Sequence, residues 1–148
     1  MSFNDTYWMR QAYQCALIAE SQHEVPVGAV VVSEKNELIA SGWNQVIQSL
    51  DPSAHAEMVA IRHAARHKKN YRLLNCTLYV TLEPCCMCAG LLIQARIKRL
   101  VYATRDVRFG AAGSVYNLVN SALSNHKIQI DDGLLQKECA ALLSRFFL

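Results

Sequence analysis

Two short motifs contain side chains that together could bind a metal ion. The first is His55-Ala56-Glu57, and the second is Pro84-Cys85-Cys86-Met87-Cys88. Cys85 and Cys88 are three residues apart, a spacing that places both side chains on one face of a helix. Two thiolates and one neutral imidazole form a typical ligand set for zinc. The sequence therefore predicts one Zn²⁺ ion per chain, held by His55, Cys85 and Cys88.

The number of protein ligands indicates what the zinc does. Three protein ligands leave a fourth position open for water, as in catalytic zinc sites, whereas structural sites are closed by four protein ligands. Glu57 is two residues from His55, about 200° around a helix, so it is poorly placed to share the ion. A carboxylate beside the ion but outside its coordination shell is placed to move protons. We therefore expect Glu57 to be the catalytic acid–base group.

Other histidines and cysteines offer alternative metal sites. Cys86 is about 100° around the helix from Cys85, and adjacent residues rarely bind one ion in good geometry. A closed, purely structural zinc site stays open as an alternative, because another histidine could reach the ion in the folded chain. His63 and His67 have a spacing that could bind metal, but they lie among basic residues. We expect those two side chains to lie on a solvated helix face.

The elements expected around these motifs alternate between strands and helices. Helices are expected at about 5–20, 54–67, 84–95 and 134–147, and strands at 27–32, 38–43, 76–82, 99–103 and 127–130. This alternation predicts an α/β domain with helices on both faces of a sheet. The first two strands form a hairpin, so the five-stranded sheet should be mixed. One domain over residues 1–148 is expected.

Composition excludes several classes of protein. Apolar residues make up 52% of the chain, which excludes a disordered protein. No apolar run approaches the roughly 20 residues of a membrane-spanning helix. The first residues show no signal-peptide pattern, and we expect a cytoplasmic protein without a membrane partner. The six cysteines should then stay reduced, with Cys15, Cys76 and Cys139 as small core residues.

Charge is unevenly distributed along the chain. Residues 62–108 contain ten Lys and Arg against two acidic residues, a net charge of +8. The other residues therefore carry −5 of the overall charge of +3. A basic middle with acidic flanks indicates a polyanionic partner such as nucleic acid. The alternative is a solvated surface that is rich in lysine and arginine.

A His-x-Glu motif paired with Pro-Cys-x-x-Cys is typical of zinc-dependent nucleobase deaminases. Along nearly its whole length, the sequence resembles the tRNA-specific adenosine deaminases of the TadA type. The stretches that carry this resemblance are 26–30, 42–44, 51–57, 82–90, 105–106, 110–114 and 141–147. The resemblance implies a three-layer α/β/α, cytidine-deaminase-like fold and a homodimer. It also implies hydrolysis of adenosine to inosine and ammonia at the tRNA wobble position, in bacteria in the anticodon loop of a tRNA for arginine.

The same resemblance implies roles for single residues. Asn44 would hydrogen-bond the flipped base, and Asp106 would contact the ribose or backbone of the target nucleotide. Further substrate-binding residues would be Val27, Ala54, Leu82, Arg105, Phe146 and Phe147, the first three as walls of the base pocket. Two alternatives remain at the sequence level: Asn44 could cap the second strand, and Asp106 could pair with Arg105 or Arg108.

Two other functions are compatible with parts of the sequence. A small-molecule deaminase acting on cytosine, cytidine, guanine or a nucleotide would share the zinc motifs. It would need neither the basic segment 62–108 nor the double phenylalanine at 146–147. A non-catalytic, zinc-stabilised RNA-binding module would require a fourth protein ligand and would give Glu57 no role.

Overall fold

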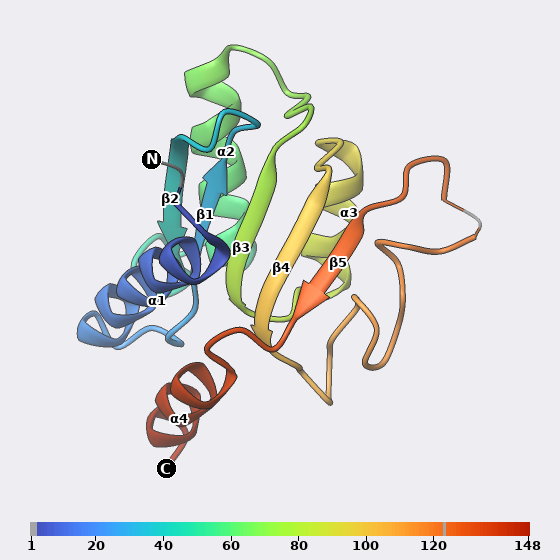
Figure 1. Ribbon diagram of the computed structural model, residues 1–148. Helices are drawn as coiled ribbons and strands as arrows, with labels where there is room; N and C mark the ends of the chain where they lie inside the picture. The colour runs from blue at the N-terminus through green and yellow to red at the C-terminus, as the bar shows by residue number, and fades with distance from the viewer. Residues whose placement is uncertain (1–2, 123) are drawn as a thin grey trace.

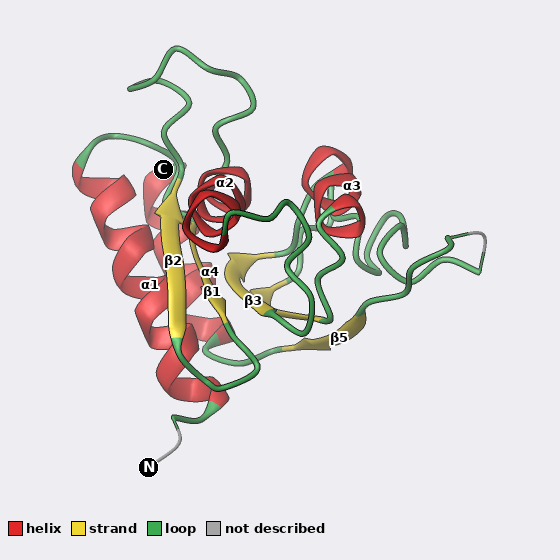
Figure 2. Ribbon diagram, turned by 90° about the horizontal axis from the view of Figure 1, so that it is seen from above, coloured by secondary structure: helices red, strands yellow, loops and turns green. Residues whose placement is uncertain are grey.

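In the computed structural model, which describes residues 3–122 and 124–148, side chains of the central strands alternate between two hydrophobic cores. In β1 (Gly28–Val32), Ala29 and Val31 face one core, while Val30 and Val32 face the other. Because successive side chains of a strand point to opposite faces, the sheet is buried on both sides. Figures 1 and 2 show α1 (Asp5–Ser21) and α4 (Gln136–Phe146) on one face. They show α2 (Ala56–Lys68) and α3 (Cys86–Gln94) on the other, which confirms the three-layer prediction.

The sheet has five strands in the order β2-β1-β3-β4-β5. The remaining strands are β2 (Leu38–Trp43), β3 (Thr77–Leu82), β4 (Arg99–Thr104) and β5 (Gln129–Asp132). β1 is antiparallel to β2 and to β3, whereas β3, β4 and β5 are parallel. The predicted mixed sheet is thus confirmed. The carboxyl ends of β3 and β4 lie at the same edge, and this edge leads into α3 and into the loop that follows β4.

The first helix begins and packs as predicted. The Asn4 side chain accepts a hydrogen bond from the Tyr7 amide at 2.9 Å and so caps α1. Trp8, Ala12, Cys15 and Ala16 form a buried stripe along this helix. The helix lies so close to β1 that a Cβ at Gly28 would overlap the carbonyl oxygen of Ala12. Only glycine permits this approach.

Two helices begin later than predicted, each because a motif residue becomes the N-cap. α2 begins at Ala56 rather than at residue 54, with His55 as an extended N-cap. In the preceding turn, Asp51 accepts the amide and hydroxyl hydrogens of Ser53. α3 begins at Cys86 rather than at residue 84, with Cys85 as its extended N-cap.

The last strand is also shifted, by two residues toward the C-terminus. The amide of Ile128 bonds to the carbonyl of Val119 and so belongs to the incoming loop. β5 instead includes Asp131 and Asp132, although aspartate is disfavoured in strands. Arg99, the first residue of β4, and Arg105, directly after its end, form ion pairs with Asp131 and Asp132, at 2.8 and 3.1 Å. These ion pairs explain the shift.

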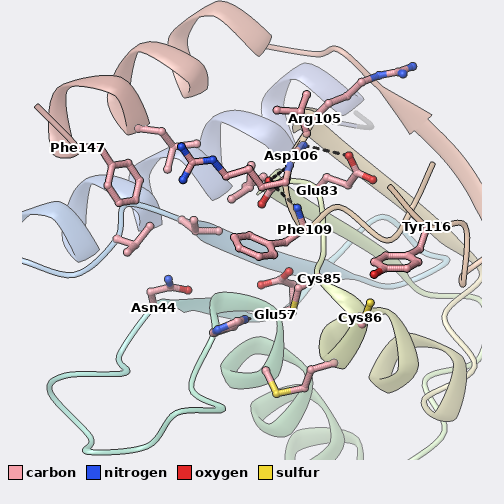
Figure 3. Close-up of a pocket in the computed structure, with 18 of the residues that line it drawn as sticks. Asn44, Glu57, Glu83, Cys85, Cys86, Arg105, Asp106, Phe109, Tyr116 and Phe147 are labelled. Atoms are coloured by element: carbon pink, nitrogen blue, oxygen red, sulfur yellow. Dashed lines mark hydrogen bonds between the residues drawn. The ribbon is translucent and has the colours of Figure 1, made fainter. Parts of the chain in front are cut away.

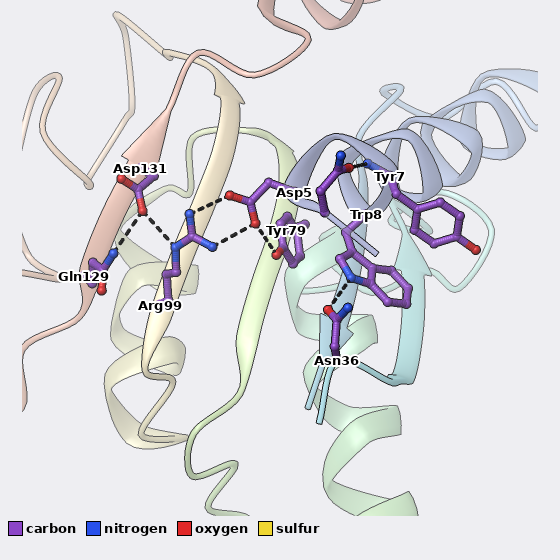
Figure 4. A network of polar contacts seen from close by, with 9 residues as sticks. Asp5, Tyr7, Trp8, Asn36, Tyr79, Arg99, Gln129 and Asp131 are labelled. Atoms are coloured by element: carbon purple, nitrogen blue, oxygen red, sulfur yellow. Dashed lines mark hydrogen bonds and ion pairs between the residues drawn. The ribbon is translucent and has the colours of Figure 1, made fainter. Parts of the chain in front are cut away.

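Arg99 also joins α1 to the sheet, as Figure 4 shows. Its guanidinium donates two hydrogen bonds to the Asp5 carboxylate, at 2.9 and 2.8 Å, and Tyr79 donates a third to Asp5 at 2.6 Å. The Arg99 guanidinium holds the pKa of the Asp5 carboxyl below its usual value. Among the described residues, no helix is both long and apolar enough to cross a membrane.

Candidate active site

The three predicted zinc ligands come together at the starts of α2 and α3. His55 Nδ1 lies 3.6 Å from Cys85 Sγ and 3.6 Å from Cys88 Sγ. A tetrahedral zinc ion, with usual Zn–N and Zn–S bond lengths, sets the N···S separation at about 3.6 Å. In the part of the chain that the structure describes, no other group of three potential ligands gathers in this way. The donor chemistry and the distances therefore both fit one zinc ion.

Each ligand is placed by a helix terminus. His55 and Cys85 are N-caps in extended conformation, and Cys88 lies in the first turn of α3. The partial positive charge of a helix N-terminus favours thiolate over thiol. Asn44 reinforces this arrangement, because its Oδ1 accepts a hydrogen bond from the Ala56 amide at 2.8 Å. Asn44 thus caps the second helix rather than the second strand.

The two cysteine sulfurs interact strongly. A hydrogen bond from Cys88, helped by His55, lowers the pKa of the Cys85 thiol to about 3. The hydrogen bond to Cys85, together with burial, raises the pKa of the Cys88 thiol. The protein alone thus holds one thiolate and one thiol. A divalent cation held between Cys85 and Cys88 would stabilise both sulfurs as thiolates, with release of the proton that they share.

Glu57 lies beside this ligand set and is only 4% exposed. Burial raises the pKa of its carboxyl group to about 7. A carboxyl group with a pKa near neutrality can both accept and return a proton under physiological conditions. Its position in the first turn of α2 agrees with the predicted place beside, rather than in, the ligand set.

These residues lie in a cleft with a volume of about 1240 Å³, drawn in Figure 3. His55, Glu57 and Cys85 all line it. Six of the eight predicted substrate-binding residues also line it: Val27, Asn44, Leu82, Arg105, Asp106 and Phe147. The structure does not bring the other two to the cleft. Ala54 is buried in the core, and Phe146 packs edge-to-face against Phe147, with ring centroids 5.0 Å apart.

Sequence reasoning missed much of the wall opposite the zinc ligands. This wall is formed by the loop after β4, residues 105–116, and by the end of α4. Val107, Phe109 and Tyr116 line the cleft and are 82, 63 and 52% exposed. Such large, exposed apolar side chains indicate a binding surface. A sequence signal existed, since these residues stand in a glycine-bearing loop directly after a buried strand. The other missed lining residues are Val25, Glu83, Cys86, Met87, Arg108, Leu143 and Ser144.

Asp106 does not form the ion pairs considered from the sequence. Its Oδ1 accepts the backbone amides of Arg108 and Phe109, at 3.0 and 3.1 Å, and so closes a turn. The Arg105 side chain pairs with Asp132 instead. The second carboxylate oxygen of Asp106 accepts no hydrogen bond from the described residues and is available to a ligand.

The basic segment does not form one surface at the cleft. Of its ten basic residues, Arg105 and Arg108 line the cleft. Arg66 and Lys68 lie in the last turn of α2, about 18 Å along the helix from its start at the zinc ligands. Arg99 belongs to the network of Figure 4, at the opposite end of β4 from Arg105. His63 and His67 are exposed, as predicted.

Comparison with known proteins agrees with this site. The family model of the cytidine and deoxycytidylate deaminase zinc-binding region matches residues 2–104. A tRNA-specific adenosine deaminase from Haemophilus influenzae is 48% identical over 143 residues, which are 97% of this chain and 83% of that protein.

Solved structures separate two branches of the same fold. One solved structure comes from studies of A-to-I editing by tRNA:A34 deaminases at the wobble position of transfer RNA. It superposes with a TM-score of 0.89 at 38% identity, over 93% of this chain and 99% of that one. A guanine deaminase from Nitrosomonas europaea superposes with a TM-score of 0.84 at 25% identity, over 99% and 85%. The chain therefore belongs to the cytidine and deoxycytidylate deaminase family of zinc proteins and, within it, to the tRNA-specific adenosine deaminases.

Proposed function

We propose that this protein hydrolyses adenosine to inosine, with release of ammonia, at the wobble position of a tRNA anticodon. The observation that carries this proposal is the buried Glu57 carboxylate beside the three zinc ligands, in a cleft with exposed aromatic walls. A closed structural zinc site would need a fourth protein ligand, and no described residue joins the three. The arrangement therefore favours catalysis over a purely structural zinc.

The reaction adds water at C6 of the adenine and removes the 6-amino group. The zinc ion bound by His55, Cys85 and Cys88 would supply Lewis-acid activation of water at neutral pH. Glu57 accepts the proton that water loses as the new C6–O bond forms. It delivers this proton to N1, and then takes the proton of the new C6 hydroxyl and passes it to the amino group, so that the C6–N bond breaks, the C6 carbonyl forms and ammonia leaves. Two other carboxylates, Glu83 and Asp106, line the cleft, but both accept hydrogen bonds from backbone amides of the loop after β4.

Asn44 supports purine recognition by offering only one kind of hydrogen-bonding group. Its Oδ1 is already occupied by the Ala56 amide. Its amide NH₂ therefore remains as a donor in the wall of the cleft, fixed in orientation by the bond that Oδ1 makes. A ring nitrogen of adenine is a matching acceptor, whereas an exocyclic amino group is not.

The outer wall favours a target nucleotide within RNA over a free nucleoside. Phe109 and Phe147 are more than half exposed and could stack on the bases next to the target. Arg108, and the guanidinium NH₂ groups of Arg105 that do not bond to Asp132, could bind backbone phosphates. An anticodon loop presents its bases outside a duplex, so that little unpairing is needed. By the same resemblance, we propose a single-domain, cytoplasmic homodimer whose bacterial substrate is a tRNA for arginine.

The test compares an anticodon stem-loop carrying adenosine at the wobble position with free adenosine, cytidine and guanine. We expect inosine and ammonia from the stem-loop alone, and a rate that falls as salt rises, because phosphate contacts release counterions. Glu57→Gln is the control for adventitious deaminase activity. Turnover of a free base or nucleoside as fast as the stem-loop would contradict the proposal and favour a small-molecule deaminase. RNA binding without any release of ammonia would favour the non-catalytic module.

A further inference from the structure

Glu83 is a fully buried carboxylate that the reaction does not use. It is 2% exposed and lies between the end of β3 and Pro84, two residues before the zinc ligand Cys85. Burying a charged carboxylate is costly unless hydrogen bonds compensate for the lost water. Where its hydrogen bonds go therefore indicates what this residue does.

All four hydrogen bonds to Glu83 come from the loop after β4. Oε1 accepts the Asp106 amide at 3.1 Å and the Ser114 hydroxyl, and Oε2 accepts the amides of Ala112 and Ser114, at 2.9 and 3.0 Å. In Figure 3, Glu83 lies next to Asp106, and a dashed line marks the hydrogen bond between them. These donors span residues 106–114, so one side chain fixes most of the loop that forms the outer wall.

Little else holds the part of this loop that reaches the cleft. Residues 105–109 contain no fully buried side chain, and Val107 and Phe109 point away from the hydrophobic cores. Asp106 is bonded to Arg108, Phe109 and Gly110 only within its own turn. Beside the Arg105–Asp132 ion pair and the bond from the Ala111 amide to the Pro84 carbonyl, the Glu83–Asp106 hydrogen bond is the contact that connects this turn to the rest of the protein.

Gly110 confirms how closely the loop is seated on this carboxylate. A Cβ at Gly110 would lie 2.5 Å from both Glu83 Oε1 and the Asp106 carbonyl oxygen. Real Cβ atoms do not approach other atoms so closely, so a larger residue would push the turn away from Glu83. Glycine and glutamate thus form a matched pair across this contact.

We propose that Glu83 is the positioning residue of the substrate wall. Its carboxylate fixes the loop 105–116, and through it Asp106 and Phe109, relative to the zinc-ligand helix that begins two residues later. The distance between the substrate wall and the zinc ligands is thereby fixed, although the two come from different segments of the chain. This inference rests on the proposed function, in which that wall binds the nucleotide.

The test measures kcat and KM for the anticodon stem-loop in Glu83→Gln and in a matched control, Glu24→Gln. Glu24 is also fully buried and accepts two backbone amides, those of Ile47 and Gln48, but it lies outside the cleft lining. Glutamine retains the shape of Glu83 but turns an NH₂ group toward amide donors. We expect KM to rise about tenfold to a hundredfold for Glu83→Gln, with kcat changed by less than about threefold and zinc content unchanged. Glu24→Gln should lower the melting temperature without this selective rise in KM.

A double-mutant cycle separates positioning from general stability. If Glu83 acts through Asp106, Glu83→Gln should weaken stem-loop turnover by less than about threefold in an Asp106→Ala background. Fully additive effects, or equal KM changes in the Glu24→Gln control, would overturn the proposal. Gly110→Ala gives an independent test, because it displaces the turn while leaving the carboxylate intact, and it should raise KM in the same way.

Amide hydrogen exchange keeps the inference distinguishable from the proposed function. Glu83→Gln should accelerate exchange of the amides of residues 106, 112 and 114 at least about tenfold, whatever the substrate is. If wild type does not deaminate the stem-loop but this acceleration occurs, the proposed function fails while the anchoring of the loop stands. Unchanged exchange in these amides would overturn the positioning role itself.

Discussion

Asn44 combines a structural and a chemical task, and two substitutions separate them. Its Oδ1 caps α2 through the Ala56 amide, and its NH₂ group faces the cleft. Asn44→Asp keeps an oxygen that can accept the Ala56 amide but removes the NH₂ donor. Asn44→Ala removes both. The pair of variants therefore measures the cap in one comparison and the donor in the other.

The magnitudes follow from the local contacts. His55, the N-cap of α2, makes no side-chain capping bond, so Asn44 is the side chain that satisfies this helix end. Losing this capping hydrogen bond should lower the free energy of unfolding by about 1–2 kcal/mol. In a chain of this size, that loss lowers the melting temperature by roughly 2–8 °C. A negative charge near a helix N-terminus is favourable, so Asn44→Asp should melt close to wild type.

The activities of the two variants should not follow the order of their melting temperatures. Both variants lack the donor to the base and should lose about tenfold to a hundredfold in kcat/KM for the stem-loop. The assay is thermal unfolding by circular dichroism, together with initial rates of inosine formation. Wild-type kcat/KM in Asn44→Asp would refute the donor role, and an unchanged melting temperature in Asn44→Ala would refute the capping role.

Three further predictions concern the metal, the acid–base group and the sheet. Cys85→Ser should lose zinc, whereas Cys86→Ser should retain it, as metal analysis of the purified variants would show; an empty Cys86→Ser protein would contradict the ligand assignment. Glu57→Gln should bind zinc and stem-loop normally but lose at least about 10²–10⁴-fold in single-turnover rate, and a near-normal rate would exclude its proton-transfer role. Because Arg99 lowers the pKa of folded Asp5, this carboxyl stabilises the fold above its unfolded pKa, and its contribution is lost as pH falls through the folded value. Urea unfolding should therefore separate wild type from Asp5→Asn at about pH 7 but not at a pH below the folded pKa of Asp5, and equal stabilities at the higher pH would contradict this assignment.

The predictions that depended on local spacing were confirmed most fully. Cys85 and Cys88 are brought together by a single helical turn, and the Asn4 cap acts on an amide three residues away. The continuous apolar run 27–32 predicted a buried strand, and β1 is covered on both faces. Such features are visible in a sequence because the interacting residues are close along the chain.

Predictions failed where distant residues decide the local structure. α2 begins later than predicted, at Ala56, because the amide of Ala56 is capped by the side chain of Asn44, twelve positions earlier in the chain. β5 includes two aspartates because Arg99 and Arg105, about 30 residues away, form ion pairs with them. The Glu83 partners lie 23 to 31 residues further along the chain. No pattern of propensity or periodicity contains these pairings, which require the folded arrangement.

The two sides of the cleft are held by different interactions, and this difference separates chemistry from recognition. Glu57 is buried and Cys88 is fully buried, so the hydrophobic core fixes the metal side. The opposite wall carries mostly exposed side chains and is held by a few polar contacts, chiefly those of Glu83. Substitutions on this wall can change which molecule binds without disturbing the metal ligands, because few packing contacts connect the two sides. We therefore expect residues 105–116 and the end of α4 to determine which substrate this protein binds.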